Sequence, residues 1–200
     1  MVIVYPVHSG LYVNLTNCCP CVCTFCIRQK DNGVYGSDSL WLDHEPDFEE
    51  VKKALIDADY SSYSEIVFCG YGEPTEAFEV LKETSAFIKK NSKLPVRLNT
   101  NGLGNLINNK NILPELKGLI DRVSISLNSS DNETYQRIVR PKFADQAYDS
   151  LINFIKEAKK YIPDITLTSV SSTISFEDEE ECQKLSDQLG VKYRIRQMKE

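Results

Sequence analysis

The sequence has no long hydrophobic run and no basic N-terminal segment. No apolar stretch approaches the roughly 18 residues of a membrane span, and residues 1–6 carry no lysine or arginine. A signal peptide would begin with basic residues and continue with a longer apolar region. We therefore expect neither a membrane protein nor an exported one, and we place the chain in the cytoplasm.

Positive charge is also scarce. The 23 lysines and arginines are outnumbered by 29 acidic residues, which leaves a formal net charge of −6. A dedicated nucleic-acid surface needs a basic footprint that neutralises phosphates. Nucleic acid is therefore not the expected partner, although modification of RNA stays open as an alternative function.

Histidine is limited to His8 and His44, and neither low-complexity tracts nor linkers interrupt the chain. His8 falls in a turn-like stretch, and no second metal ligand lies at a suitable local spacing. A chain of 200 residues with 42% hydrophobic content can bury one sizeable core. We expect a single domain over 1–200, with a short N-terminal strand extension at 1–10.

Cysteine, by contrast, is concentrated in one place. Five of the seven cysteines lie within residues 17–28, and only Cys19, Cys23 and Cys26 have the spacing C-x3-C-x2-C. Thiolate is the usual ligand of iron–sulfur clusters. Three thiolates on a short loop can hold three irons of a [4Fe–4S] cluster and leave the fourth iron open to another ligand.

Two other interpretations of the cysteines compete with the cluster. A disulfide knot is disfavoured because the count is odd and no export signal is present. A zinc site can be written from the pairs Cys18/Cys21 and Cys23/Cys26, but one residue separates these pairs, whereas zinc ribbons and fingers separate them by a dozen or more. A zinc-binding or iron–sulfur module without enzymatic activity therefore remains an alternative.

Strand and helix patterns alternate along the rest of the chain, and a polar loop is expected over 29–43. Right-handed crossovers then give parallel strands with helices outside, hence an α/β fold. The expected strands are 2–5, 11–15, 65–69, 95–99, 122–127, 165–171 and 191–195, and the expected helices are 47–59, 75–90, 112–119, 145–161 and 178–189.

Ligands of parallel α/β folds bind at the carboxyl ends of the strands, so the residues there are site candidates. One strand runs into Gly70-Tyr71-Gly72-Glu73-Pro74, where glycines let the backbone approach a ligand. Taken alone, the segment is explained better by a glycine turn before a helix, because Pro74 then sits close to the helix start. The next strand ends in Asn99-Thr100-Asn101-Gly102, for which a plain Asn-Gly turn is the alternative.

The cysteine motif, with Phe25 before its last cysteine, resembles the C-x3-C-x-Φ-C hallmark of the radical SAM superfamily. The resemblance implies a partial (β/α)6 TIM-like barrel with a [4Fe–4S] cluster on Cys19, Cys23 and Cys26. It also implies that S-adenosylmethionine (SAM) chelates the open iron and is cleaved to methionine and a 5′-deoxyadenosyl radical. An electron donor such as flavodoxin or ferredoxin would supply the electron.

The resemblance also assigns SAM contacts. Gly70, Gly72 and Glu73 match the family's motif for the methionine amino group, and Phe25 would pack near adenine. Along the strand 122–127, side-chain alternation puts Ser124, Ser126 and Asn128 on one face. Ser126 and Asn128 match the family's ribose contacts. The remaining cofactor-binding candidates are Asn99, Asn101, Thr168 and Arg140. Arg140 lies in a segment interpreted as a loop that holds the SAM carboxylate or an anionic substrate, for which a solvated charge cluster is an equal alternative.

Within the superfamily, the stretches Y-P-V-H-S-G-L-Y-V-N-L-T-N and F-C-G-Y-G-E-P-T look most like the radical SAM proteins linked to the TatD family. The implied function is hydrogen abstraction from an unidentified substrate, either a small molecule or a protein. The compact core also resembles activating enzymes of glycyl-radical proteins, which act on a protein partner.

Overall fold

The computed structural model describes residues 1–29 and 36–197, and its centre is a seven-stranded sheet in chain order. The first two strands form an antiparallel hairpin, and every later pair of neighbouring strands is parallel. Strands β2 to β7 therefore form the six parallel strands of the predicted partial barrel. The strands are β1 (Val4–Val7), β2 (Gly10–Val13), β3 (Glu65–Phe68), β4 (Val96–Thr100), β5 (Arg122–Ser126), β6 (Asp164–Val170) and β7 (Lys192–Arg196).

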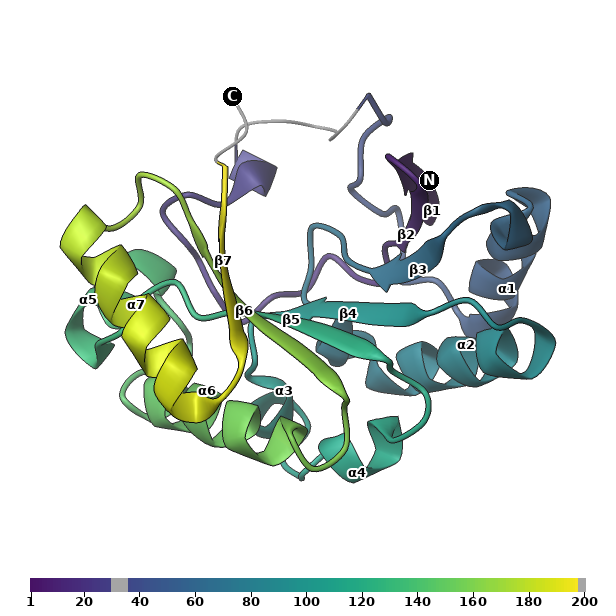
Figure 1. Cartoon of the computed structure of the whole chain (residues 1–200). Coiled ribbons are helices and arrows are strands. Elements are labelled where there is room, and N and C mark those ends of the chain that lie inside the picture. The colour runs from purple at the N-terminus through teal and green to yellow at the C-terminus, as the bar shows by residue number, and fades with distance from the viewer. Residues whose placement is uncertain (30–35, 198–200) are drawn as a thin grey trace.

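The helices lie along the outer side of the curved sheet (Figure 1). They are α1 (Phe48–Asp57), α2 (Phe78–Asn91), α3 (Gly104–Ile107), α4 (Leu113–Leu116), α5 (Asn132–Val139), α6 (Gln146–Ala158) and α7 (Phe176–Leu189), with 3₁₀ turns η1 (Ile27–Gln29), η2 (Tyr60–Ser62) and η3 (Pro74–Ala77). The predicted α/β class is confirmed. The predicted loop over 29–43 lies partly outside the described residues.

Capping and amphipathic spacing explain why these helices form where they do. At α1, the Asp47 side chain accepts from the backbone N–H of Glu50 at 2.9 Å, and Glu50 reaches back to the N–H of Asp47 at 3.0 Å. This capping box satisfies helix-end donors that would otherwise lack partners. Val51 and Leu55, four residues apart, are then buried against the sheet.

The segment around Arg137 is a helix, which corrects its interpretation as a loop. Asp131 caps α5 by accepting from the N–H of Thr134 at 2.8 Å. Tyr135, Ile138 and Val139 are buried, and they fall at the i, i+3, i+4 spacing of one helix face. The chain leaves the helix at Arg140, which has a left-handed φ of 52° and precedes Pro141. The basic side chains therefore lie on and after a helix end.

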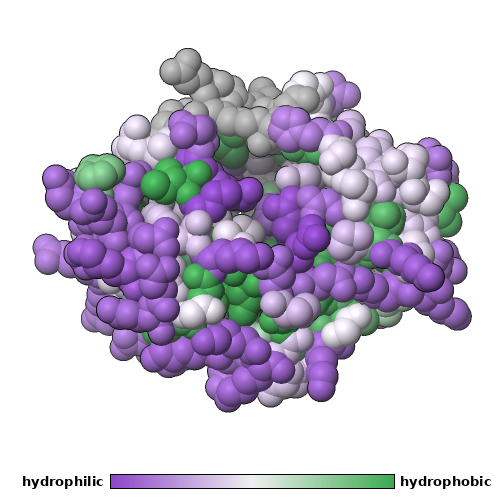
Figure 2. All heavy atoms as spheres, viewed as in Figure 1, coloured by the Kyte–Doolittle hydropathy of each residue, from purple (hydrophilic) through white to green (hydrophobic). Residues whose placement is uncertain are grey.

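The concave face of the sheet carries the polar alternates of each strand. Leu98, Ile125 and Leu167 pack with the helices in the core, so their strand neighbours, such as Asn99 and Ser124, point the other way. In Figure 2, hydrophilic residues cover much of this side of the molecule, around a hollow near its middle. Within residues 1–29 and 36–197, no helix is long and apolar enough to cross a lipid bilayer.

Candidate functional site

The cysteine-rich loop leaves the carboxyl end of β2 and is held in place by its backbone. The N–H of Thr24 donates to the carbonyl of Ile138 at 2.9 Å, and the N–H of Lys142 donates to the carbonyl of Pro20 at 2.8 Å. These bonds pair the loop with the end of α5 and the turn that follows it. Main-chain contacts therefore anchor this part of the loop to α5 and the turn after it.

All seven cysteines are free thiols. Cys21 is 3% exposed and forms hydrogen bonds with the thiols of Cys19 and Cys23. These hydrogen bonds are the main reason why the pKa of Cys19 and the pKa of Cys23 are lowered. They are also the main reason why the pKa of Cys21 is raised. Burial raises the pKa of Cys26. In the described ranges, no three His, Cys, Asp or Glu side chains already meet at metal-binding geometry. The donor chemistry nevertheless suits an iron–sulfur cluster, since the proposed ligands Cys19, Cys23 and Cys26 are among five free thiols on one loop.

The loop from Gly70 to Glu73 follows β3 and packs directly on the cysteine loop. The N–H of Glu73 donates to the carbonyl of Cys18 at 2.8 Å. A Cβ atom on Gly72 would lie 2.2 Å from the carbonyl oxygen of Thr16, and one on Gly70 would lie 2.0 Å from Oδ1 of Asn14. Neither position admits a side chain, so both glycines are needed for this close approach.

The carboxylate of Glu73 is 4% exposed and joins this loop to the end of β4. Oε1 accepts from the hydroxyls of Thr100 at 2.6 Å and Thr75 at 2.8 Å, and Oε2 accepts from the N–H of Asn101 at 2.8 Å. Burial raises the pKa of this carboxyl, while the hydrogen bonds from Thr100, Asn101 and Thr75 act in the opposite direction. Its oxygens thus fix two strand ends together, and a contact with a SAM amino group stays a prediction.

The raised pKa of Glu73 gives a pH dependence with a defined sign. The fold favours the protonated carboxyl, so its contribution to stability is present below the ordinary pKa of about 4.3 and is lost as pH rises through the folded-state value. The unfolding free energy of the native protein minus that of Glu73→Gln should therefore fall as pH rises above about 4. Urea unfolding of both proteins at a series of pH values above this point measures it, and a difference that rises with pH would contradict the burial argument.

Two buried amide oxygens at neighbouring strand ends lack hydrogen-bond partners among the described residues. They are Oδ1 of Asn99 in β4 and Oδ1 of Asn128 just after β5. The N–H of Asn128 donates to the carbonyl of Thr168 at 3.1 Å, and its φ of 62° is a left-handed conformation that asparagine tolerates. A buried acceptor without a donor is costly, so both atoms are candidates for receiving a ligand hydroxyl or amine.

The other predicted cofactor contacts lie around the same strand ends. Ser126 and Thr168 are register partners on β5 and β6, and Asn101 reaches back to the sulfur of Cys21 at 3.8 Å. Phe25 is half-buried against the core. Arg140 is exposed, and its Nε lies 3.4 Å from the carbonyl of Arg137. The assignment of these residues to SAM stays a prediction.

Sequence reasoning missed Asn14 and Thr75, which shape the site, and gave Thr100 no role of its own. Nδ2 of Asn14 donates a hydrogen bond to the carbonyl of Leu40 at 2.7 Å. Its Oδ1 is a third buried acceptor without a partner in the described chain. Thr75 and Thr100 hold the Glu73 carboxylate. The signal for Asn14 was available, because alternation from Tyr12 puts it on the concave face at the end of β2.

The comparison with family models identifies the class. The model of the radical SAM superfamily matches residues 13–189, which includes the cysteine loop, the 70–73 loop and strands β3 to β6. The chain therefore belongs to the radical SAM superfamily. Members are enzymes that use a [4Fe–4S] cluster and SAM, and the three free thiols and the glycine-lined approach fit those groups.

Solved structures show the same fold at low sequence identity. SuiB from Streptococcus suis bound to S-adenosylmethionine is 14% identical with a TM-score of 0.70, covering 96% of this chain and 41% of its own. A radical SAM methyltransferase from Sphaerobacter thermophilus is 16% identical with a TM-score of 0.63, covering 97% and 57%. TYW1 with a bound lysine–pyruvate adduct is 18% identical with a TM-score of 0.67, covering 96% and 66%.

The chain thus spans 39–41% of the SuiB chains that head the structural matches. No curated protein matches the sequence significantly.

Proposed function

We propose that this chain binds a [4Fe–4S] cluster through Cys19, Cys23 and Cys26 and reductively cleaves SAM at the carboxyl ends of its parallel strands. The observation that supports this most is the contact between the two loops. The backbone of Glu73 bonds to Cys18, and Gly72 lies against Thr16 with no room for a side chain. A molecule bound to an iron on the cysteine loop would therefore lie beside an open stretch of peptide backbone.

The remaining roles follow from position. When bound, the cluster and SAM supply one-electron reduction and a carbon-centred radical for hydrogen abstraction. Gly70 and Gly72 let the methionine part of SAM approach the backbone. Glu73 ties their loop to the end of β4 by accepting from the N–H of Asn101. The unpartnered Oδ1 of Asn128, with Ser126 beside it, is suited to accept from ribose hydroxyls. Phe25 would pack against the adenine.

Asn99, Asn101, Thr168 and Arg140 complete the proposed cofactor contacts. Asn99 offers a second buried acceptor, and Thr168 lies beside Ser126 in the register. Asn101 ties the end of β4 both to Glu73 and to the cysteine loop. Arg140 is the cation on the turn that braces this loop, and it would face the SAM carboxylate.

Anaerobic reconstitution with iron and sulfide tests the proposal. After reduction with dithionite and addition of SAM, we expect a cluster signal in EPR that SAM perturbs, together with slow formation of 5′-deoxyadenosine measured by chromatography. The unreduced sample with SAM is the control and should form none. Zinc without iron, or a four-iron cluster whose EPR spectrum ignores SAM, would sink the proposal and leave a metal-binding module.

Within the superfamily, we favour the group linked to the TatD family, on the sequence stretches around Tyr5 and Gly72 and not on any structural finding.

A second candidate is an activating enzyme that acts on a protein partner. The exposed edge strand β7 favours it, because four of its five residues are exposed, which leaves this side accessible to a large substrate. A glycyl radical detected in a co-expressed partner would support it; turnover of a small metabolite alone would count against it. Flavodoxin or ferredoxin is the proposed electron donor.

A further inference from the structure

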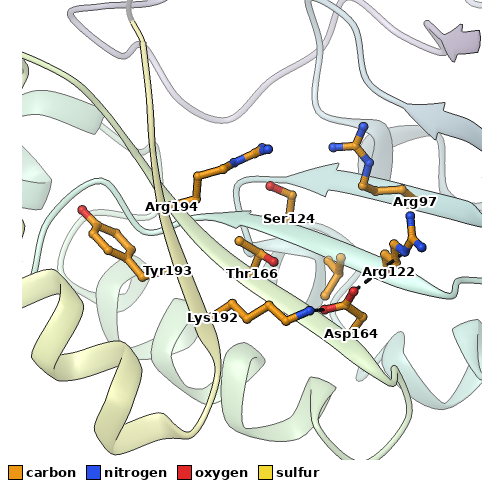
Figure 3. Close-up of a pocket in the computed structure, with 9 residues that line it drawn as sticks. Arg97, Arg122, Ser124, Asp164, Thr166, Lys192, Tyr193 and Arg194 are labelled. Carbon is orange, nitrogen blue, oxygen red and sulfur yellow. Dashed lines mark hydrogen bonds and ion pairs between the residues drawn. The ribbon is translucent and has the colours of Figure 1, made fainter. Parts of the chain in front are cut away.

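A cavity of about 310 Å³ lies on the concave face of strands β4 to β7, away from the cysteine loop. We call it the basic pocket. Its floor is made by Ser124 and Thr166, and the long side chains of Arg97 and Arg194 extend from β4 and β7 beside that floor (Figure 3). It is also lined by Arg122, Val123, Asp164, Lys192 and Tyr193.

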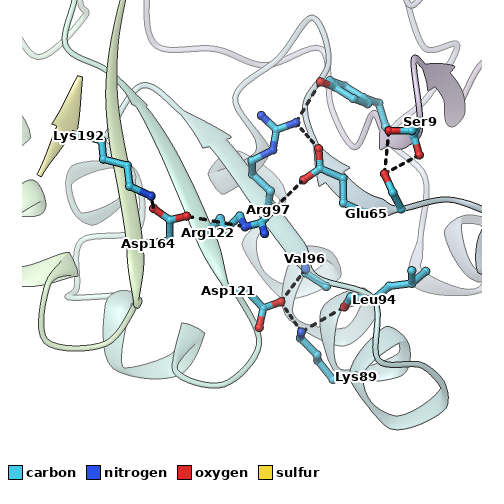
Figure 4. Close-up of polar contacts among 12 residues, drawn as sticks. Ser9, Glu65, Lys89, Leu94, Val96, Arg97, Asp121, Arg122, Asp164 and Lys192 are labelled. Carbon is cyan, nitrogen blue, oxygen red and sulfur yellow. Dashed lines mark hydrogen bonds and ion pairs between the residues drawn. The ribbon is translucent and has the colours of Figure 1, made fainter. Parts of the chain in front are cut away.

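Positive charge exceeds negative charge at this pocket. Figure 4 shows a row of ion pairs across the strands: Lys192 with Asp164 at 2.7 Å, Arg122 with Asp164 at 3.8 Å and with Glu65 at 3.6 Å, and Arg97 with Glu65 at 2.8 Å. Arg194 makes no ion pair within the described part of the chain. Three cations therefore share two carboxylates and Arg194 adds a fourth positive charge, which leaves a surplus of two in a protein whose net charge is −6.

Arg97 is held as a fixed donor at one side of the pocket. One of its terminal nitrogens donates to the hydroxyl of Tyr12 at 3.2 Å and to Glu65 at 2.8 Å. Its Nε is buried and finds no acceptor among the described residues. A buried donor without an acceptor is costly, and a guanidinium whose orientation is already set loses little entropy on binding an oxyanion.

We infer that the basic pocket binds an anionic group of the substrate, a carboxylate or a phosphate, through Arg194 and Arg97 with the hydroxyls of Ser124 and Thr166. Guanidinium groups match the geometry of both anions. As a statement about the substrate, this rests on the proposed function. Arg97 precedes Asn101 by four residues, so the pocket lies roughly 13 Å along β4 from the proposed SAM end. The reacting carbon of the substrate would lie between the two.

Binding of simple anions to the purified chain, without iron or SAM, tests the pocket by itself. We would titrate inorganic phosphate and malonate by calorimetry at low ionic strength into the native protein, Arg194→Gln and Lys156→Gln. Lys156 is an exposed cation on α6, on the outer side of the sheet, and is the matched control. Arg194 is exposed and unpaired in the described chain, so its replacement should not disturb folding.

We expect at least one of the two anions to bind the native protein and Lys156→Gln alike, and Arg194→Gln to bind it about tenfold more weakly or worse. The anion that binds more tightly identifies the group. If neither anion binds, or if Arg194→Gln binds as tightly as the native protein, the inference is overturned.

The same variants separate this inference from the proposed function. Reconstituted Arg194→Gln should still form 5′-deoxyadenosine from SAM, because Arg194 lies in the basic pocket and not among the proposed cofactor contacts. Loss of anion binding with retained SAM cleavage supports both claims. Absence of SAM cleavage in the native protein would defeat the proposed function while the calorimetric result for the pocket stood independently.

Discussion

Replacing Cys23 with alanine is expected to abolish formation of 5′-deoxyadenosine and to lower the iron bound after reconstitution. Cys23 is the middle ligand of the proposed three, and removing it leaves two thiolates for a cluster that requires three from this loop. The backbone of the loop bonds to the end of α5, so the variant should remain folded. Iron content, the EPR spectrum and the chromatographic assay measure the loss, and circular dichroism checks the fold.

Cys18→Ala is the matched control for this experiment. Cys18 lies in the same loop but is exposed and falls outside the C-x3-C-x2-C spacing. Its replacement should leave iron content and 5′-deoxyadenosine formation close to those of the native protein. Equal losses in both variants would mean that the ligand register is wrong, and full activity in Cys23→Ala would exclude Cys23 as a ligand.

Replacing Gly72 with alanine is expected to destabilise the protein and to weaken SAM binding together. The new Cβ would lie 2.2 Å from the carbonyl oxygen of Thr16 and 2.7 Å from that of Cys18. Both neighbours are backbone atoms, so relief requires the two loops to move apart. Such overpacking costs about 1–3 kcal/mol of unfolding free energy. Urea denaturation measures this cost, and calorimetric titration of SAM into the reconstituted protein measures the affinity.

Gly10→Ala provides the comparison for this variant. The nearest side-chain atoms to a Cβ on Gly10 are 3.4 Å away, on Glu65 and Tyr12, which is ordinary van der Waals contact. We expect its unfolding free energy and SAM affinity to stay near those of the native protein. If Gly72→Ala were as stable and bound SAM as tightly as Gly10→Ala, the close approach of the two loops would not matter for the site.

Local patterns in the sequence were enough to predict the order of the strands and the positions of helices α1, α2, α4, α6 and α7, whereas α3 and α5 were not expected. Period-two alternation and short apolar runs gave six parallel strands, because each strand alternates between the helix layer and the concave face. The helix α5 was missed because its basic residues drew the interpretation toward a ligand-binding loop. The i, i+3, i+4 spacing of Tyr135, Ile138 and Val139 was nevertheless present in the sequence.

The polar interior of the site was harder to predict, since its partners come from distant strands. The role of Arg97 could not be predicted because its partners, Glu65 and Tyr12, come from β3 and β2. Likewise, the sequence put Arg194 and Tyr193 on opposite faces of β7 but could not say which face lines the hollow. The structure decides this: the Arg194 side chain extends beside the floor of the basic pocket (Figure 3), whereas Tyr193, which only borders the pocket, packs against the core and pairs its hydroxyl with Ser169 at 2.5 Å.

The main-chain bonds between the cysteine loop and the end of α5 have a consequence for how the protein matures. In zinc fingers, metal binding and folding are one event, because the ligands are brought together only by the metal. Here Thr24 and Lys142 already anchor the loop through their amides. We therefore expect the polypeptide to fold first and to receive iron and sulfide afterwards, at a loop whose main chain is already anchored.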